Sequence, residues 1–142
     1  MSFLLRTRSA TTAVEFAVCG LAMVLIVIGF AEFRRLVRIS EVLQETASEG
    51  ARCMGLRSSS CAAAGVYSAD NTTAYVVSVA NSRGVVITAT TIALNNAAIC
   101  GGAAGFSSVA INYDLITVVP ILLTSLGAGF NVPATACFPN NS

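Results

Sequence analysis

Two groups of side chains in this sequence have types and spacings that suggest chemistry: one carboxylate beside an apolar run, and a set of cysteines. Glu15 directly precedes the segment Phe16–Ala31, which contains no charged residue. A carboxylate inside a bilayer is costly unless it is neutralised or paired, and the amino-terminal end of a helix favours a nearby anion. Glu15 is therefore either an interaction residue that needs a cationic partner, or an ordinary first-turn acid at the level of the lipid headgroups.

The cysteines divide into one inside the apolar run and four after it. Cys19 is interpreted as a small apolar residue. The four later cysteines predict two disulfides formed in an oxidising compartment. Of the three connectivities, we favour Cys53–Cys61, which closes a short loop at a helix end. The second bridge is then Cys100–Cys137, which ties the last strand to the preceding loop. Structural zinc is the alternative, but no pair has the usual two-to-four-residue spacing.

Other chemistry is excluded by the residue types that are absent. All eight basic residues are arginine, and the chain has no Lys, His or Trp. There is therefore no imidazole base, no Schiff-base lysine and no His-containing metal site. The segment 101–105 is glycine-rich but lacks a lysine, so it is interpreted as a flexible loop rather than a phosphate cradle. We expect no enzyme activity, no cofactor, no metal and no small-molecule substrate.

Composition bounds the class of protein. The chain has 142 residues, of which 55% are hydrophobic and 11% charged, so a disordered chain is excluded and one domain with a modest core is expected. Lys+Arg (8) nearly balance Asp+Glu (7), which gives no electrostatic support for a nucleic-acid partner. Residues 56–142 contain only four charges, at Arg57, Asp70, Arg83 and Asp114. Such a surface suits a domain packed against partners or a membrane; the alternative is an uncharged domain wetted by Ser, Thr and Asn.

One long helix must position Glu15. As a helix, Phe16–Ala31 alone rises only about 24 Å, short of a hydrocarbon core of roughly 30 Å, so the span extends back towards Ala10. Apolar residues then continue at three- and four-residue spacing as far as Met54, and Gly55 is the expected stop. We expect a leader (1–10), a transmembrane helix (11–31) and an amphipathic extension of that helix (32–55).

From Leu56 onward the sequence predicts a small domain, 56–142, and the fold class is α+β with a short antiparallel sheet. Loops are expected at 58–60 and 70–73, and a short Ala-rich turn or helix at 61–66. Residues 75–79 fit helix and strand equally. The remaining expected elements are strands at 85–92, 109–113 and 130–137 and an apolar helical turn at 120–126, with Pro133 at a sheet edge or an irregular strand start.

The amino-terminal residues resemble a known family. The segment Thr12–Ala17 (TAVEFA), the apolar run, and then Glu32–Leu36 (EFRRL) look like the signature of TadE-like pseudopilins, minor components of the tight-adherence (Tad/Flp) pilus machinery. The segment Gln44–Arg52 (QETASEGAR) is similar to the stretch that closes the family's long helix. The resemblance covers Thr11–Arg52, whereas 109–137 is only loosely similar.

The resemblance implies cleavage by a prepilin peptidase between Ala10 and Thr11, five residues before the glutamate; family members usually have Gly where this chain has Ala10. Cleavage creates an α-amino group at Thr11, which Glu15 of a neighbouring subunit could approach when helices stack with an axial offset. Glu15 and Phe16 are thus the expected assembly residues. The implied partners are other pilin or pseudopilin subunits, inner-membrane pilus assembly proteins, the peptidase and membrane lipid.

Charge alone does not settle which end of the chain is exported. Two arginines precede the span and three follow it closely: Arg6, Arg8, Arg34, Arg35 and Arg38. The positive-inside rule would keep the second group in the cytoplasm, whereas the cysteines favour export of everything after Ala31. Residues 29–31 also have the small-x-small form of a signal-peptidase site, which would make residues 1–31 a removable secretion signal.

These observations favour a single-pass protein of the bacterial inner membrane with a periplasmic or extracellular C-terminal domain. Its expected role is structural: initiating, priming or capping a Tad/Flp pilus, either as part of the filament or outside it. The alternative is a single-pass, membrane-anchored extracytoplasmic binding module that does not enter a filament. Retention of residues 1–10 in the mature protein would favour the module.

Overall fold

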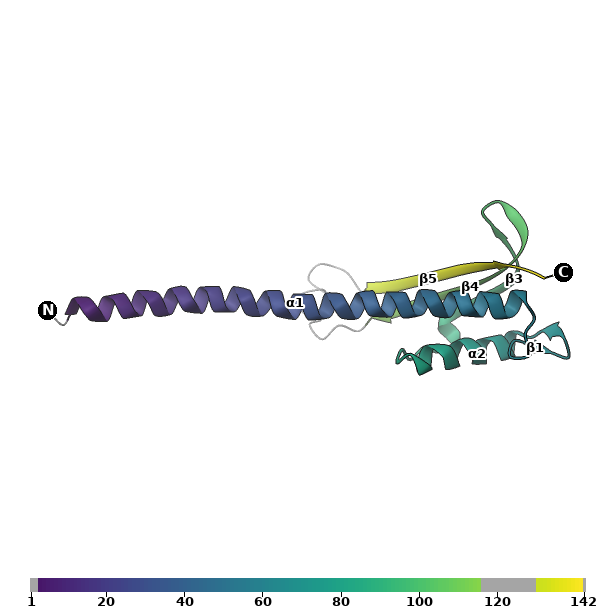
Figure 1. The fold of residues 1–142 in the computed structure, drawn as a ribbon, viewed down its shortest axis with the longest axis horizontal. Helices are drawn as coiled ribbons and strands as arrows, with labels where there is room; N and C mark the ends of the chain where they lie inside the picture. Colours follow the sequence, from purple (N-terminus) through teal and green to yellow (C-terminus); the bar gives the residue numbers. More distant parts are fainter. Residues whose placement is uncertain (1–2, 116–129, 142) are drawn as a thin grey trace. The chain divides into compact units, whose positions relative to one another are not determined.

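The computed structural model describes residues 3–115 and 130–141, in two compact units, Met1–Arg35 and Leu36–Ser142. Its class is α+β, as predicted: a long amino-terminal helix and a small domain with an antiparallel sheet (Figure 1). The helical turn expected at 120–126 lies outside the described residues. The elements are α1 (Phe3–Gly55), β1 (Ala62–Ala63), β2 (Val66–Tyr67), α2 (Ala69–Ser82), the 3-10 helix η1 (Ala89–Thr91), β3 (Ile92–Cys100), β4 (Ala103–Leu115) and β5 (Phe130–Pro139).

The three-stranded sheet has the order β3-β4-β5, with both strand pairs antiparallel. The strands expected at 109–113 and 130–137 are confirmed within β4 and β5. Alternate residues of these two strands are buried and their neighbours are more exposed, which is the pattern of a sheet with one face on the core. The buried positions are Ser107, Val109, Ile111, Leu115, Val132 and Ala134.

Pro133 lies on an edge strand, as expected, because β5 is the last strand of the sheet. The carbonyl of Thr135 accepts a hydrogen bond from Gln44 Nε2 of α1 at 2.9 Å, so the backbone of Thr135 points away from β4. Pro133 and Pro139 are an even number of residues from Thr135, so their backbone groups also point away from β4. Neither proline therefore removes a ladder hydrogen bond, and together they protect this edge from pairing with another strand.

The core of the second unit forms where one stripe of α1 meets α2 and the sheet. The stripe recurs every three or four residues, as the helical period requires, and consists of Ile39, Leu43, Ala47, Ala51 and Met54. Val76 and Ala80 face it from α2. In Figure 1 this part of α1 lies between α2 and strands β4 and β5. The predicted amphipathic pattern of α1 thus supplies a large share of the domain core.

Gly50 allows the closest approach in this core. A Cβ atom built at Gly50 would lie 2.7 Å from Val76 Cγ2 of α2 and 3.3 Å from Val109 Cγ2 of β4. The first distance is too short for carbon atoms in van der Waals contact, so any side chain would push α1 away from its two neighbours. The glycine is therefore required by packing rather than by backbone freedom.

Helix α1 ends at Gly55, as predicted, and packing requires a glycine there. Gly55 is not left-handed; a Cβ there would lie 2.7 Å from Phe138 Cδ1 and 2.8 Å from the Pro139 carbonyl oxygen. The left-handed residue is Arg57, with φ 49°. The N–H of Ser58 bonds the carbonyl of Cys53 and the N–H of Arg57 bonds that of Met54, which is a Schellman motif. An arginine at this position costs about 1–2 kcal/mol of backbone strain that glycine avoids.

Two local predictions around the start of α2 differ from the structure, the first in part and the second entirely. Residues 61–66, expected as a turn or helix, contain strand β1 and the start of β2 in a small hairpin whose turn has Ala64 at φ 51° and Gly65 at φ 79°. Positive φ at both central residues suits a type I′ turn, which favours a hairpin over a helix. Residues 70–73, expected as a loop, form the first turn of α2. Ser68 caps this helix by accepting the Asn71 N–H, because Ser, Asp, Asn and Thr are favourable at helix starts as well as in loops.

The segment around residue 85 also differs from the prediction. The ambiguous run 75–79 is helical, with Thr72, Val76 and Ala80 buried at four-residue spacing. Residues 85–88, expected to begin a strand, are extended and alternate between buried and exposed, but they pair with no described strand. The ladder begins only at Ile92, after the 3-10 helix. The β-branched residues correctly predicted an extended backbone, but strand pairing depends on neighbours that are far away in the sequence.

We predict that Gly50→Ala lowers the free energy of unfolding by about 1–3 kcal/mol, because the added methyl overpacks the contact with Val76 and Val109. The measurement is urea unfolding of the full chain in detergent, followed by tyrosine fluorescence; Tyr67, Tyr75 and Tyr113 all lie in the second unit. Ser48→Ala, an exposed position in the same helix, is the matched control. Equal midpoints for the two variants would contradict the packing account.

Candidate functional site

The first candidate site is the apolar stretch of α1. The side chains from Thr12 to Ala31 are exposed throughout, apart from partly covered Gly20; Phe16, for example, is 79% exposed. An 18-residue window of this helix has a mean hydropathy of 2.5. By length and composition, the helix is long and apolar enough to cross a membrane. Exposed apolar side chains on every side of a helix are unfavourable in water. This stretch therefore fits membrane anchoring.

The predicted assembly residues lie at the start of that stretch. Glu15 and Phe16 are both exposed on α1, and the backbone of Ala10 and Thr11 is helical. Within the described part of the chain Glu15 has no salt-bridge partner. The carboxylate is thus available to a group from outside the chain.

The second candidate site is the segment Gln44–Arg52, which the structure uses for packing. Four of its small residues are buried, namely Thr46, Ala47, Gly50 and Ala51, whereas Ser48 is exposed. Its long polar residues reach out to other elements, Gln44 to the edge of β5 and both glutamates to the end of α2. The alternation of small and polar types in this segment is therefore explained by contacts inside one domain.

Arg83 was not singled out from the sequence, although it makes the most extensive polar contact of this segment. It is the C-cap of α2, and its two guanidinium nitrogens bind Glu45 Oε2 at 2.8 Å and Glu49 Oε1 at 2.6 Å. Glu49 is also three residues from Arg52, at helical spacing, but in the structure it pairs with an arginine from another element. Glu45 and Glu49 are four residues apart, so they lie on the same face of α1 and both carboxylates reach the one guanidinium group of Arg83.

The four later cysteines form two disulfides, Cys53–Cys61 and Cys100–Cys137, with Cα–Cα distances of 5.8 and 6.5 Å. These are the two pairs favoured from the sequence, and Cys19 is free. Each bridge is expected to contribute about 2–4 kcal/mol by restricting the unfolded chain. In the described ranges, no group of three or more His, Cys, Asp or Glu is placed to hold a metal ion.

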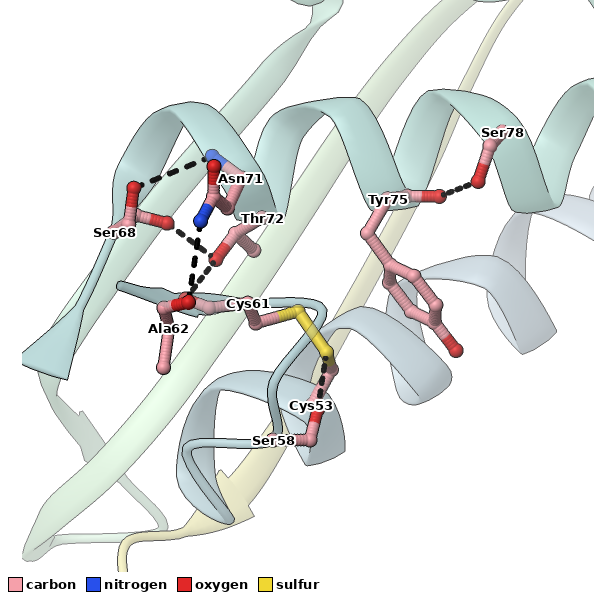
Figure 2. Close-up of a disulfide and its surroundings, with 9 residues drawn as sticks. All are labelled: Cys53, Ser58, Cys61, Ala62, Ser68, Asn71, Thr72, Tyr75 and Ser78. Atoms are coloured by element: carbon pink, nitrogen blue, oxygen red, sulfur yellow. Dashed lines mark hydrogen bonds between the residues drawn. A yellow bond between two sulfur atoms is a disulfide. The ribbon is translucent and has the colours of Figure 1, made fainter. Parts of the chain in front are cut away.

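Figure 2 shows the first bridge, which joins the end of α1 to the segment just before β1. Cys53 is in the last turn of α1, and Ser58 Oγ donates to its sulfur at 2.9 Å. Cys61 lies just before β1, and the hydroxyl proton of Thr72 in α2 is shared between the carbonyl of Ser68, at 2.8 Å, and that of Cys61, at 3.3 Å. Asn71 Nδ2 donates to the next carbonyl, that of Ala62, at 3.2 Å. The bridge and these two bonds fix the start of α2 against the end of α1.

A comparison with protein-family models finds a match to one described as TadE-like protein, over residues 10–52. The match includes the residue before the expected cut, Glu15, the apolar stretch and all of Gln44–Arg52. It agrees with the resemblance found in the sequence. No curated protein and no solved structure matches the chain.

We predict that Arg83→Gln lowers the free energy of unfolding by about 1 kcal/mol, because both carboxylates are partly solvated and their attraction is screened. The loss should shrink as salt is raised, which a purely steric effect would not do. Arg38→Gln, at an exposed arginine of the same unit, is the control. A double-mutant cycle between Arg83→Gln and Glu49→Gln measures the coupling; zero coupling would contradict the ion pair.

Proposed function

We propose that this protein is a membrane-anchored minor pseudopilin that acts structurally in the assembly of a Tad/Flp pilus, by initiating, priming or capping it. The observation that carries the proposal is the TadE-like match over a helix that contains one carboxylate at the start of its exposed apolar stretch. Neither the family match nor the residue types point to catalysis. The partners are other pilin or pseudopilin subunits and inner-membrane assembly proteins.

The proposed anchor is the span 11–31, placed in the bacterial inner membrane. Residues 32–55 leave the bilayer as an amphipathic helix, and 56–142 form the extracytoplasmic domain. The packing of Ile39–Met54 into the domain core supports this division, since a core stripe cannot also lie in lipid. Export of the domain is supported by the two disulfides, which require an oxidising compartment. Arg34, Arg35 and Arg38, which follow the span, then lie on the exported side of the membrane, against the positive-inside preference.

Processing is proposed between Ala10 and Thr11 by a prepilin peptidase. The cut would remove the first turns of α1 and leave Thr11 as the amino-terminal residue, four positions before Glu15. Ala10 is small, as is the glycine usual at this position in the family. The new α-amino group is then the nearest cation that a neighbouring copy or a related subunit can offer to Glu15 in lipid.

Pairing between subunits accounts for a carboxylate at this depth. Glu15 has no salt-bridge partner within the described residues, and a lone charge in lipid costs several kcal/mol. An α-amino group from an adjacent, axially offset helix offsets this cost in one stagger and in no other. The pair therefore selects the register in which helices stack, and the apolar side chains around it, such as Phe16, supply the contact area.

We predict that Glu15→Gln still inserts into the membrane and is still cut after Ala10, but loses co-purification with partner pilus subunits by at least about tenfold. The amide keeps the size of the side chain and is easier to place in lipid, whereas the attraction to an α-amino group is lost. Glu32→Gln, at the other end of the apolar stretch, is the matched control and should assemble normally.

The measurements are membrane flotation for insertion, the mass of the mature chain for cleavage, and immunoprecipitation with pilus output for assembly. Glu15→Gln protein that is inserted, cut and assembled at the normal level would leave Glu15 as an ordinary acid at the headgroups. Failure of both variants to assemble would point to a general need for acidic residues rather than to a specific pair.

A further inference from the structure

A cleft of about 230 Å³ opens in the second unit beside the end of α1. Arg57 and Met54 line it from the helix end, Val66 and Tyr67 from β2, and Ser107 and Asn140 from the sheet side. The cleft is smaller than the sites that hold cofactors and drug-sized ligands, which begin at about 300 Å³. Its size suits one side chain or one chain end.

The polar floor of the cleft is already satisfied by internal hydrogen bonds. Ser107 Oγ donates to Asn140 Oδ1 at 2.6 Å, and Asn140 Nδ2 donates to the Asn96 carbonyl at 2.8 Å. The Asn140 N–H also donates to the Gly105 carbonyl at 2.8 Å. The floor is therefore held in place, so that a ligand would meet a preformed surface rather than a mobile one.

Two polar side chains of the cleft have no partner in the part of the chain that the structure describes. The Arg57 guanidinium forms no salt bridge there, in contrast to Arg83, which holds two carboxylates. The Tyr67 hydroxyl likewise makes no hydrogen bond to a described residue. Burial raises the pKa of Tyr67, so its hydroxyl stays protonated and can donate. The cleft thus presents one full positive charge and one neutral donor.

The backbone gives an independent reason to look for a role of Arg57. It is the left-handed residue of the Schellman motif, with φ 49°, where glycine would be free of strain. A cation near the end of a helix gains something from the helix dipole, but Arg52 already provides one in the last turn of α1. The arginine at position 57 thus adopts a conformation that its local preference disfavours, as happens at binding sites.

We propose that this cleft binds a single carboxylate carried by a peptide segment of a partner protein. The guanidinium of Arg57 pairs with the carboxylate and Tyr67 donates to it, while the neighbouring apolar residue of the peptide packs on Val66, which is 69% exposed. One guanidinium with one hydroxyl matches one negative charge rather than a phosphate. The proposal deepens the assembly role and rests on it for the partner being a pilus subunit.

The test is an NMR titration of the full-length protein in detergent micelles, observing the Arg57 side chain and the Tyr67 ring. The probes are the peptides acetyl-Val-Glu-Val-amide, acetyl-Val-Gln-Val-amide and acetyl-Val-Gln-Val with a free carboxyl end. Saturable shifts with the glutamate peptide identify a side-chain carboxylate, and shifts with the free-ended peptide identify a chain terminus; the neutral peptide should give none. Shifts as large with acetate alone as with both carboxylate peptides would overturn the peptide proposal.

Variants at position 57 separate binding from folding. Arg57→Gly should raise the midpoint of thermal unfolding, because it relieves the left-handed strain, and should weaken peptide binding at least about tenfold. Arg57→Asn removes the charge with a residue that tolerates this conformation, and Arg57→Lys keeps the charge and part of the affinity. Undiminished binding by Arg57→Gly, or no saturable shift with either carboxylate peptide, would overturn the proposal.

The outcomes also separate this site from the role in assembly. Peptide binding through Arg57 by a chain that never joins pilus subunits would contradict the assembly role and support the cleft, because the titration needs no pilus. If the wild-type protein binds the peptide and assembles, and Arg57→Gly does neither, both the cleft and the assembly role are supported.

Discussion

The exposed apolar surface of α1 is the constraint on which the rest of this structure depends. Between Thr12 and Ala31 the helix presents apolar side chains in all directions, and none of them is buried within the described chain. Such a surface must be covered by lipid or by other helices. The same requirement applies to Glu15. A carboxylate on a helix covered in this way needs a partner, whereas a carboxylate on a helix in water needs none.

Further along α1 the same residue types serve a different purpose. From Ile39 to Met54 the apolar residues form one stripe, and the domain packs on it so closely that Gly50 has no room for a methyl group. The segment Gln44–Arg52 lies inside the family match, and its residues are accounted for by this packing and by the fork of Arg83. One part of the matched region therefore builds the domain, and the other part is free to contact lipid or neighbouring subunits.

The sequence was most informative where a feature depends on residues close together along the chain. The helical period of α1, its end at Gly55, the strand at 109–113 and the disulfide partners could all be predicted in this way. Features that depend on distant neighbours could not. Val85–Thr88 has the residues of a strand but finds no strand to pair with, and Arg83 gains its role only because α2 ends beside Glu45 and Glu49. Arg57 is a further case, since nothing local indicates that an arginine would occupy the left-handed position where glycine is usual.

The mass of the mature protein, purified from the membranes of cells that contain the pilus machinery, distinguishes a processed pseudopilin from the alternatives. We expect a chain that begins at Thr11, having lost the first ten residues and nothing else. A chain that still begins at Met1 would contradict this expectation and favour an anchored binding module. A chain that begins at Glu32 would also contradict it, because the apolar stretch would then be a removable secretion signal rather than an anchor.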